Sequence, residues 1–124
     1  MWPFGKDRRQ LIRRAVCWEA LLHCTFSNFQ DTLKIRVVNI SSRGTVLHLE
    51  RLQIGPYHLA ISDQPPQLEL EILLPEGPLK ANVEIRWYDW LENQRIFAVG
   101  VEFIDLSEKS QEILLQAINN LPGQ

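Results

Sequence analysis

Apolar and polar side chains alternate in short runs along most of this chain, and turn residues separate the runs. In residues 68–72, for example, leucine or isoleucine occupies every second position and glutamate fills the gaps. A period of two puts the apolar residues on one face of a strand, so each run predicts a half-buried strand. Similar runs lie in residues 16–22, 33–40, 45–50, 79–87 and 96–104. The pattern predicts five or six short strands, as in small antiparallel barrels.

The end of the chain has a different period. Apolar residues recur there at helical spacing, at Ile113, Leu114, Ala117, Ile118 and Leu121. Ser107 is a good N-cap residue, and Pro122-Gly123 favours a stop. A helix with one apolar stripe must pack against another apolar surface. The order of strands followed by one helix therefore favours a mainly β domain, an antiparallel barrel with a C-terminal helix packed against it.

The connection over residues 51–67 is the longest segment without a clear period. It contains Gly55-Pro56 and Pro65-Pro66, which are strong turn signals. A short apolar piece within it, residues 57–61, fits either an extra strand or a packed loop. Elsewhere the connections are short, with turn residues in 27–31 and 75–78. A further loop is expected near residues 89–93.

Length and charge limit the possible functions. The chain has 124 residues, which is one domain, and its formal net charge is −2. A general affinity for polyanions is therefore not expected, and any cationic function must be local. Five cations do cluster within residues 6–14. We interpret residues 1–14 as a basic arm, poorly ordered without a ligand, and residues 15–121 as the barrel and helix.

Cys17 and Cys24 form no CxxC pair, and with the scattered histidines they give no zinc spacing. They are expected to be reduced, partly buried thiols in a cytoplasmic protein. No apolar run reaches the length of about 18 residues that a membrane span needs, and the N-terminus lacks the apolar core of a secretion signal. We therefore expect a cytoplasmic protein without membrane insertion.

Two polar clusters carry the chemistry. The first is an RRxxxR run made by Arg8, Arg9 and Arg13, and the second is an NxSxxG turn made by Asn39, Ser41 and Gly44. Arginine presents a planar fork of donors that fits a phosphate or the O6/N7 edge of guanine. Short polar side chains and a glycine, which permits a positive φ or a close backbone approach, suit a turn beside a ligand. Each cluster alone is weak evidence, because basic arms and polar turns are common. Together they indicate a site for a small anionic nucleotide.

These two motifs, in this order within a chain of strands ending in a helix, resemble the PilZ domain family of bacterial cyclic di-GMP receptors. The likeness continues through the GVEF sequence of residues 100–103, which is similar to the last strand of the family. It covers residues 8–121. The resemblance implies a six-stranded antiparallel barrel with a C-terminal helix. The long connection at residues 51–67 departs from the short turn typical of the family and is a candidate partner surface.

The resemblance also implies roles for the motif residues. Arg9 and Arg13 would grip the phosphates and guanine edges of cyclic di-GMP, and Arg8 would add charge. Asn39 and Ser41 would hydrogen-bond the ligand, and Gly44 would shape the turn. Arg43, at a free position of the motif, is expected to be a solvated arginine or a further phosphate contact. Whether one or two ligand molecules bind is left open.

The implied function is regulatory, with cyclic di-GMP as ligand and an unidentified output protein as partner, in motility, exopolysaccharide production or chemotaxis by analogy. A protein–protein adaptor that keeps the scaffold but binds no nucleotide is the alternative. A nucleic-acid binder is disfavoured by the net charge and by the lack of basic residues interleaved with aromatic ones. No hydrolase, metal or dinucleotide motif is present, so we expect no enzyme, no cofactor and no metal.

Overall fold

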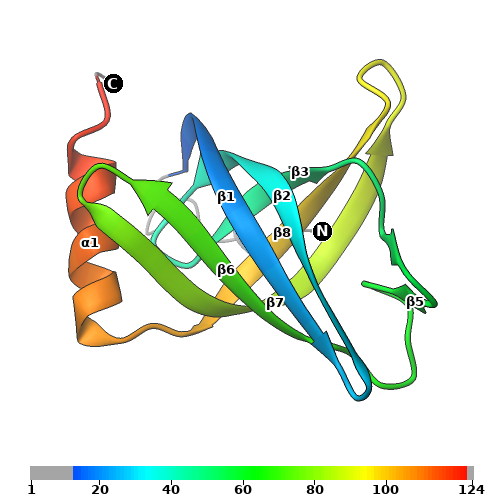
Figure 1. Cartoon of the computed structure of the whole chain (residues 1–124). Coiled ribbons are helices and arrows are strands. Elements are labelled where there is room, and N and C mark those ends of the chain that lie inside the picture. Colours follow the sequence, from blue (N-terminus) through cyan, green and yellow to red (C-terminus); the bar gives the residue numbers. More distant parts are fainter. Residues whose placement is uncertain (1–12, 123–124) are drawn as a thin grey trace.

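The computed structural model describes residues 13–122. Six antiparallel strands form a closed barrel in the order β1-β2-β3-β8-β7-β6, and α1 lies beside one end of it (Figure 1). The barrel strands are β1 (Arg14–Phe26), β2 (Phe29–Ile40), β3 (Gly44–Leu49), β6 (Gln67–Leu74), β7 (Gly77–Leu91) and β8 (Ile96–Asp105). The fold class expected from the sequence is confirmed. Within residues 13–122, no helix has the length and apolar character needed to cross a membrane.

The alternating residues of the strands fill the barrel interior. In β1 the inward positions become progressively more buried, so that Leu22 and Cys24 are each 1% exposed. Opposite them lie β2 and β6, with Leu22 paired to Leu33 on one side and to Leu70 on the other. The slip in the alternation of β2 corresponds to an irregularity in its pairing with β3 between Val37 and Asn39. The period-two pattern therefore identified the core directly.

The connection after β3 folds into a small hairpin of β4 (Gln53–Ile54) and β5 (Tyr57–His58). Ile54 is fully buried, and the Tyr57 ring stacks on Phe26 with centroids 4.4 Å apart. Because Phe26 is the last residue of β1, the hairpin covers the β1–β2 end of the barrel, away from α1 (Figure 1). Part of the apolar piece at residues 57–61 is thus a strand, and the connection is packed.

One strand is longer than predicted. A loop was expected near residues 89–93, but β7 continues to Leu91 and pairs there with Ile96 of β8. The prediction was wrong because the hairpin extends beyond the barrel core. There both faces of the strand meet solvent, so the sequence no longer alternates between apolar and polar residues. Tyr88 and Trp90 are each 41% exposed on this extension.

The C-terminal helix α1 (Glu108–Asn119) begins as the sequence predicts. The Ser107 side chain accepts a hydrogen bond from the Ser110 amide, and the Ser110 hydroxyl donates to the carbonyl of Lys80 in β7. Its buried residues include Ile113, Leu114 and Ala117. The amphipathic stripe therefore packs on the barrel at β7, as the sequence requires.

The predicted arm at residues 1–14 lies mostly outside the described residues. Its predicted lack of order in residues 1–12 therefore stays a prediction. Arg14, the last residue assigned to the arm, is the first residue of β1 and pairs with Ile40 of β2.

Candidate ligand-binding site

The pairing of β1 with β2 places Arg13, the last arginine of the first motif, close to the second motif. Arg14 is opposite Ile40 and Ala15 is opposite Asn39, so Arg13 immediately precedes the residue that faces the end of β2. The Arg13 residue is exposed to solvent. Arg8 and Arg9, the other arginines of the first motif, lie outside the described residues. The start of β1 and the β2–β3 turn therefore form one continuous surface.

Ser41 holds the β2–β3 turn from inside. It is fully buried, and its hydroxyl accepts hydrogen bonds from the amides of Arg43 and Gly44 at 3.2 and 3.3 Å. The same hydroxyl donates to the Gly44 carbonyl at 3.3 Å, and the Ser41 amide donates to that carbonyl at 2.9 Å. These contacts occupy the hydroxyl within the turn. The geometry favours a role for Ser41 in shaping the site, and its predicted direct contact with the ligand stays a prediction.

Gly44 and Asn39 occupy different environments at the turn. The glycines with positive φ in residues 13–122 are Gly55 and Gly77, so of the two possibilities stated for Gly44, a positive φ or a close backbone approach, the positive φ is not used. Gly44 is instead buried where β3 pairs with β8. Asn39 is half-buried and its carbonyl accepts the Thr45 hydroxyl. Within the described residues its side-chain amide makes no hydrogen bond, and its predicted contact with the ligand stays a prediction.

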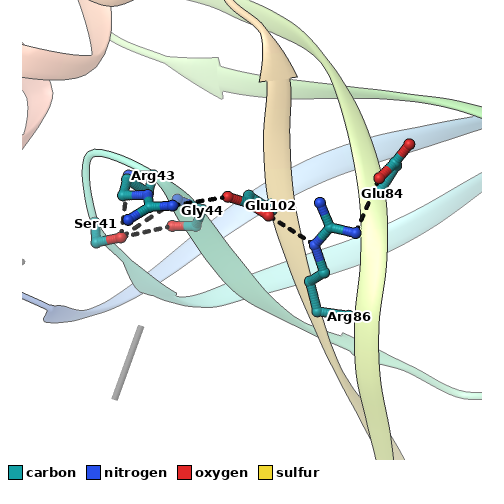
Figure 2. A network of polar contacts seen from close by, with 6 residues as sticks. All are labelled: Ser41, Arg43, Gly44, Glu84, Arg86 and Glu102. Atoms are coloured by element: carbon teal, nitrogen blue, oxygen red, sulfur yellow. Dashed lines mark hydrogen bonds and ion pairs between the residues drawn. The ribbon is translucent and has the colours of Figure 1, made fainter. Parts of the chain in front are cut away.

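A network of charges runs from this turn across β8 to β7 (Figure 2). The Glu102 carboxylate accepts from Arg43 Nη2 at 3.2 Å through one oxygen and from Arg86 Nε at 2.6 Å through the other. Arg86 Nη1 also lies 2.9 Å from a carboxylate oxygen of Glu84. The hydrogen bond from Arg86, followed by that from Arg43, lowers the pKa of Glu102, while its partial burial opposes this shift. The hydrogen bond to Glu102 raises the pKa of Arg86. The carboxylate therefore stays ionised, and two cations flank it.

The backbone explains why these residues meet. Glu102 is paired with Gly44 of β3 on one side and with Glu84 of β7 on the other. Arg86 is the extra residue of an irregularity in β7, because Ile85 faces Val101 and Trp87 faces Gly100. Such bulges turn a side chain away from its regular direction. Here the Arg86 guanidinium lies between two glutamates that would otherwise repel each other across the sheet.

Sequence reasoning did not find Arg86, Glu84 or Glu102. Their alternation with apolar residues marks them as outward-facing, which is the usual position of a solvated charge. Only the register of β3, β8 and β7 shows that they adjoin the second motif. The sequence carries no signal of the irregularity in β7, because residues 79–87 alternate between apolar and polar side chains without a break.

The surface around the turn is shallow. A hollow of about 190 Å³ is lined by residues of the turn, of β8 and of the first turn of α1, including Arg43, Glu102 and Gln111. A larger hollow of about 830 Å³ lies on the wall of β1, β2 and β3, and it contains none of the predicted ligand-binding residues. Among the described residues, neither hollow is lined by a predicted ligand-binding residue. The smaller one is lined by Ser42 and Arg43, at the free positions of the second motif, so we place the candidate site at the turn.

Comparisons with known proteins identify the family and support the fold. The chain matches the family described as PilZ domain over residues 7–120. No curated protein matched the chain. The fold is similar to the PilZ domain of YcgR from Escherichia coli, solved with c-di-GMP, with a TM-score of 0.61, 14% identity, 92% of this chain and 91% of that chain covered.

Two longer proteins contain a similar domain. The inhibitor of motility (MotI/DgrA) of Bacillus subtilis has a TM-score of 0.65 at 19% identity, with 91% of this chain and 53% of that chain covered. MrkH from K. pneumonia, solved as a complex with c-di-GMP, has a TM-score of 0.66 at 12% identity, with 91% and 51% covered. The chain therefore spans about half the length of these two proteins. At such identities the likeness shows the fold alone.

Proposed function

The chain belongs to the PilZ domain family, and we propose that it is a receptor for cyclic di-GMP that changes its surface on binding and thereby regulates a partner protein. The observation that supports the proposal is the pairing of Arg14 with Ile40, because it leaves Arg13, the motif arginine within the described residues, close to the end of β2 where the NxSxxG turn lies. Two structural neighbours bind c-di-GMP on the same fold. The partner would belong to motility, exopolysaccharide production or chemotaxis.

In this proposal each motif residue contributes by its position. Arg9 and Arg13 bind phosphate and guanine edges from the arm, and Arg8 adds charge. The Asn39 amide supplies donors and an acceptor, while Ser41 and Gly44 fix the turn on which the ligand rests. The arm then becomes ordered over the turn when the ligand is present, which presents a new surface to the partner.

The remaining features of the proposal follow from a receptor role. The domain binds and does not catalyse, and it needs no cofactor beyond its nucleotide ligand. It acts in the cytoplasm without binding nucleic acid polymers.

Calorimetric titration of the full chain with cyclic di-GMP tests the proposal. We expect a dissociation constant near micromolar, about −8 kcal/mol, and the same titration returns the number of ligands bound. Arg13→Ala should weaken binding by about 10- to 150-fold, as loss of a charge-assisted contact does. Arg14→Ala is the matched control and should cost much less. Its guanidinium lies 3.5 Å from the Pro122 carbonyl, at the C-terminal side of the domain.

Two results would contradict the proposal in different ways. No heat at saturating ligand would remove the receptor function and favour the nucleotide-free adaptor. Equal losses for Arg13→Ala and Arg14→Ala would mean that net charge drives binding, and the roles assigned to the motif would be wrong.

A further inference from the structure

The two arginines that flank Glu102 are held unequally. Arg86 donates through Nε at 2.6 Å and also contacts Glu84, and its side chain is 36% exposed. Arg43 donates only through Nη2 at 3.2 Å, and its side chain is 51% exposed. The longer, more solvated contact is the easier of the two to break, because water screens and replaces it. Arg43 is therefore the releasable partner of Glu102.

The backbone of Arg43 is held by two hydrogen bonds of its own, independently of the contact between its side chain and Glu102. The Arg43 carbonyl accepts the Phe103 amide at 2.8 Å, and its own amide donates to the Ser41 hydroxyl. The residue thus stays within the NxSxxG turn whichever way its guanidinium points. A guanidinium that leaves Glu102 remains beside the candidate ligand.

Arg86 keeps Glu102 paired when Arg43 leaves. An ionised carboxylate with 19% exposure would be costly to strand without a cation. The bulge at Arg86 places its guanidinium between Glu84 and Glu102, so one oxygen of Glu102 stays satisfied. The network carries two positive and two negative charges before ligand binds. An added phosphate therefore has to compete with Glu102 for a cation.

We infer that Glu102 holds Arg43 in reserve, and that Arg43 transfers from the Glu102 carboxylate to a phosphate of cyclic di-GMP while Arg86 retains Glu102. This inference rests on the proposed function. It adds Arg43 to the ligand-binding residues, and it makes Glu102 and Arg86 positioning residues that set how readily Arg43 is released.

The test is calorimetric titration of the full chain with cyclic di-GMP. Arg43→Met should weaken binding by about 10-fold or more, because a charge-assisted hydrogen bond to phosphate is lost. Glu102→Gln should tighten binding by about two- to fivefold, the range that partly exposed ion pairs give, because the competitor for Arg43 is removed. Glu50→Gln is the matched control for charge, since Glu50 follows the far end of β3 from Gly44.

Arg86 is tested through a double-mutant cycle, because it is argued to act through Glu102. Arg86→Met should weaken binding by about two- to fivefold, since Glu102 then holds Arg43 alone. In the Glu102→Gln background the same change should have no more effect than Arg51→Met, a distant loss of one cation. A purely structural role for Arg86 would give equal losses in both backgrounds and would overturn the inference.

The outcomes separate this inference from the proposed function. If the unaltered chain binds no cyclic di-GMP, both fall. If it binds and depends on Arg13, but Glu102→Gln weakens binding or leaves it unchanged, only the inference falls. If a Glu102 variant fails to fold, Arg43→Met still tests the inference, because Arg43 is exposed and its side chain makes no core contact. Unchanged affinity in Arg43→Met would also overturn the inference.

Discussion

Ser41 lies in the β2–β3 turn with no exposed surface, and its hydroxyl takes part in three hydrogen bonds with the turn backbone. Its neighbour Ser42 is exposed in the same turn. A buried backbone amide that loses its partner cannot turn to water, so the cost of removing the hydroxyl falls on the folded state. The Ser41 hydroxyl therefore stabilises the folded turn even in the absence of a ligand.

We therefore expect Ser41→Ala to destabilise the domain by about 1–3 kcal/mol, the cost of unsatisfied buried groups. Ser42→Ala is the matched control and should stay within about 0.5 kcal/mol of the unaltered protein, as exposed substitutions do. Urea denaturation measures both. Equal stability of the two variants would mean that the turn does not depend on the buried hydroxyl.

The β4–β5 hairpin, within the long connection after β3, depends on the glycine in its turn. Gly55 has a φ of +57°, which allows the two-residue turn between Ile54 and Tyr57. A Cβ atom at Gly55 would also lie 2.8 Å from the ring of Phe29. The Gly55-Pro56 turn positions Tyr57 so that its ring stacks on Phe26 and its hydroxyl donates to Asn28, between β1 and β2. Glycine is required at this position for both conformation and space.

Gly55→Ala should accordingly destabilise the domain by about 1–3 kcal/mol, the typical cost of a strained backbone conformation. Denaturant unfolding provides the measurement. Repeating the substitution in a Phe29→Leu background separates the two causes, since only the close contact with the ring is relieved there. Unchanged stability in Gly55→Ala would show that the hairpin turn is not held in this conformation.

The closed barrel shields one of its two thiols and leaves the other open. Cys24 is 1% exposed among the core side chains, whereas Cys17 lies on the outer side of the same strand. Burial, with a smaller contribution from the Asp31 carboxylate, raises the pKa of Cys24 to about 12. The thiolate is the reactive form, so Cys24 is protected both by access and by its protonation.

A thiol reagent such as Ellman's reagent at pH 8 should therefore label Cys17 quickly and Cys24 only on global unfolding. Cys17→Ser should leave no rapidly reacting thiol in the folded protein, while both thiols should react in denaturant. Rapid labelling of folded Cys17→Ser would contradict a barrel closed around Cys24. If Cys24 reacts only in unfolded molecules, its labelling rate reports how often the barrel opens.

Much of this molecule follows from the sequence alone. The period-two runs predict the barrel strands and their inward faces, because a strand buried on one side must alternate. Ser107 and the helical stripe after it predict α1 and its packing. The two polar motifs predict a ligand site from local residue types alone, and that site stays a prediction.

Only the tertiary structure decided which polar groups meet. Arg43 lies in the β2–β3 turn, Glu102 in β8 and Arg86 in β7, and their contact depends on register and on one bulge in β7. The same holds for the packed hairpin at residues 51–67, whose burial depends on the β1–β2 end of the barrel. Cross-strand register is a sum of many weak side-chain contacts over the whole sheet. No single stretch of sequence contains that information, and the charge network around the second motif became visible only once the barrel had closed.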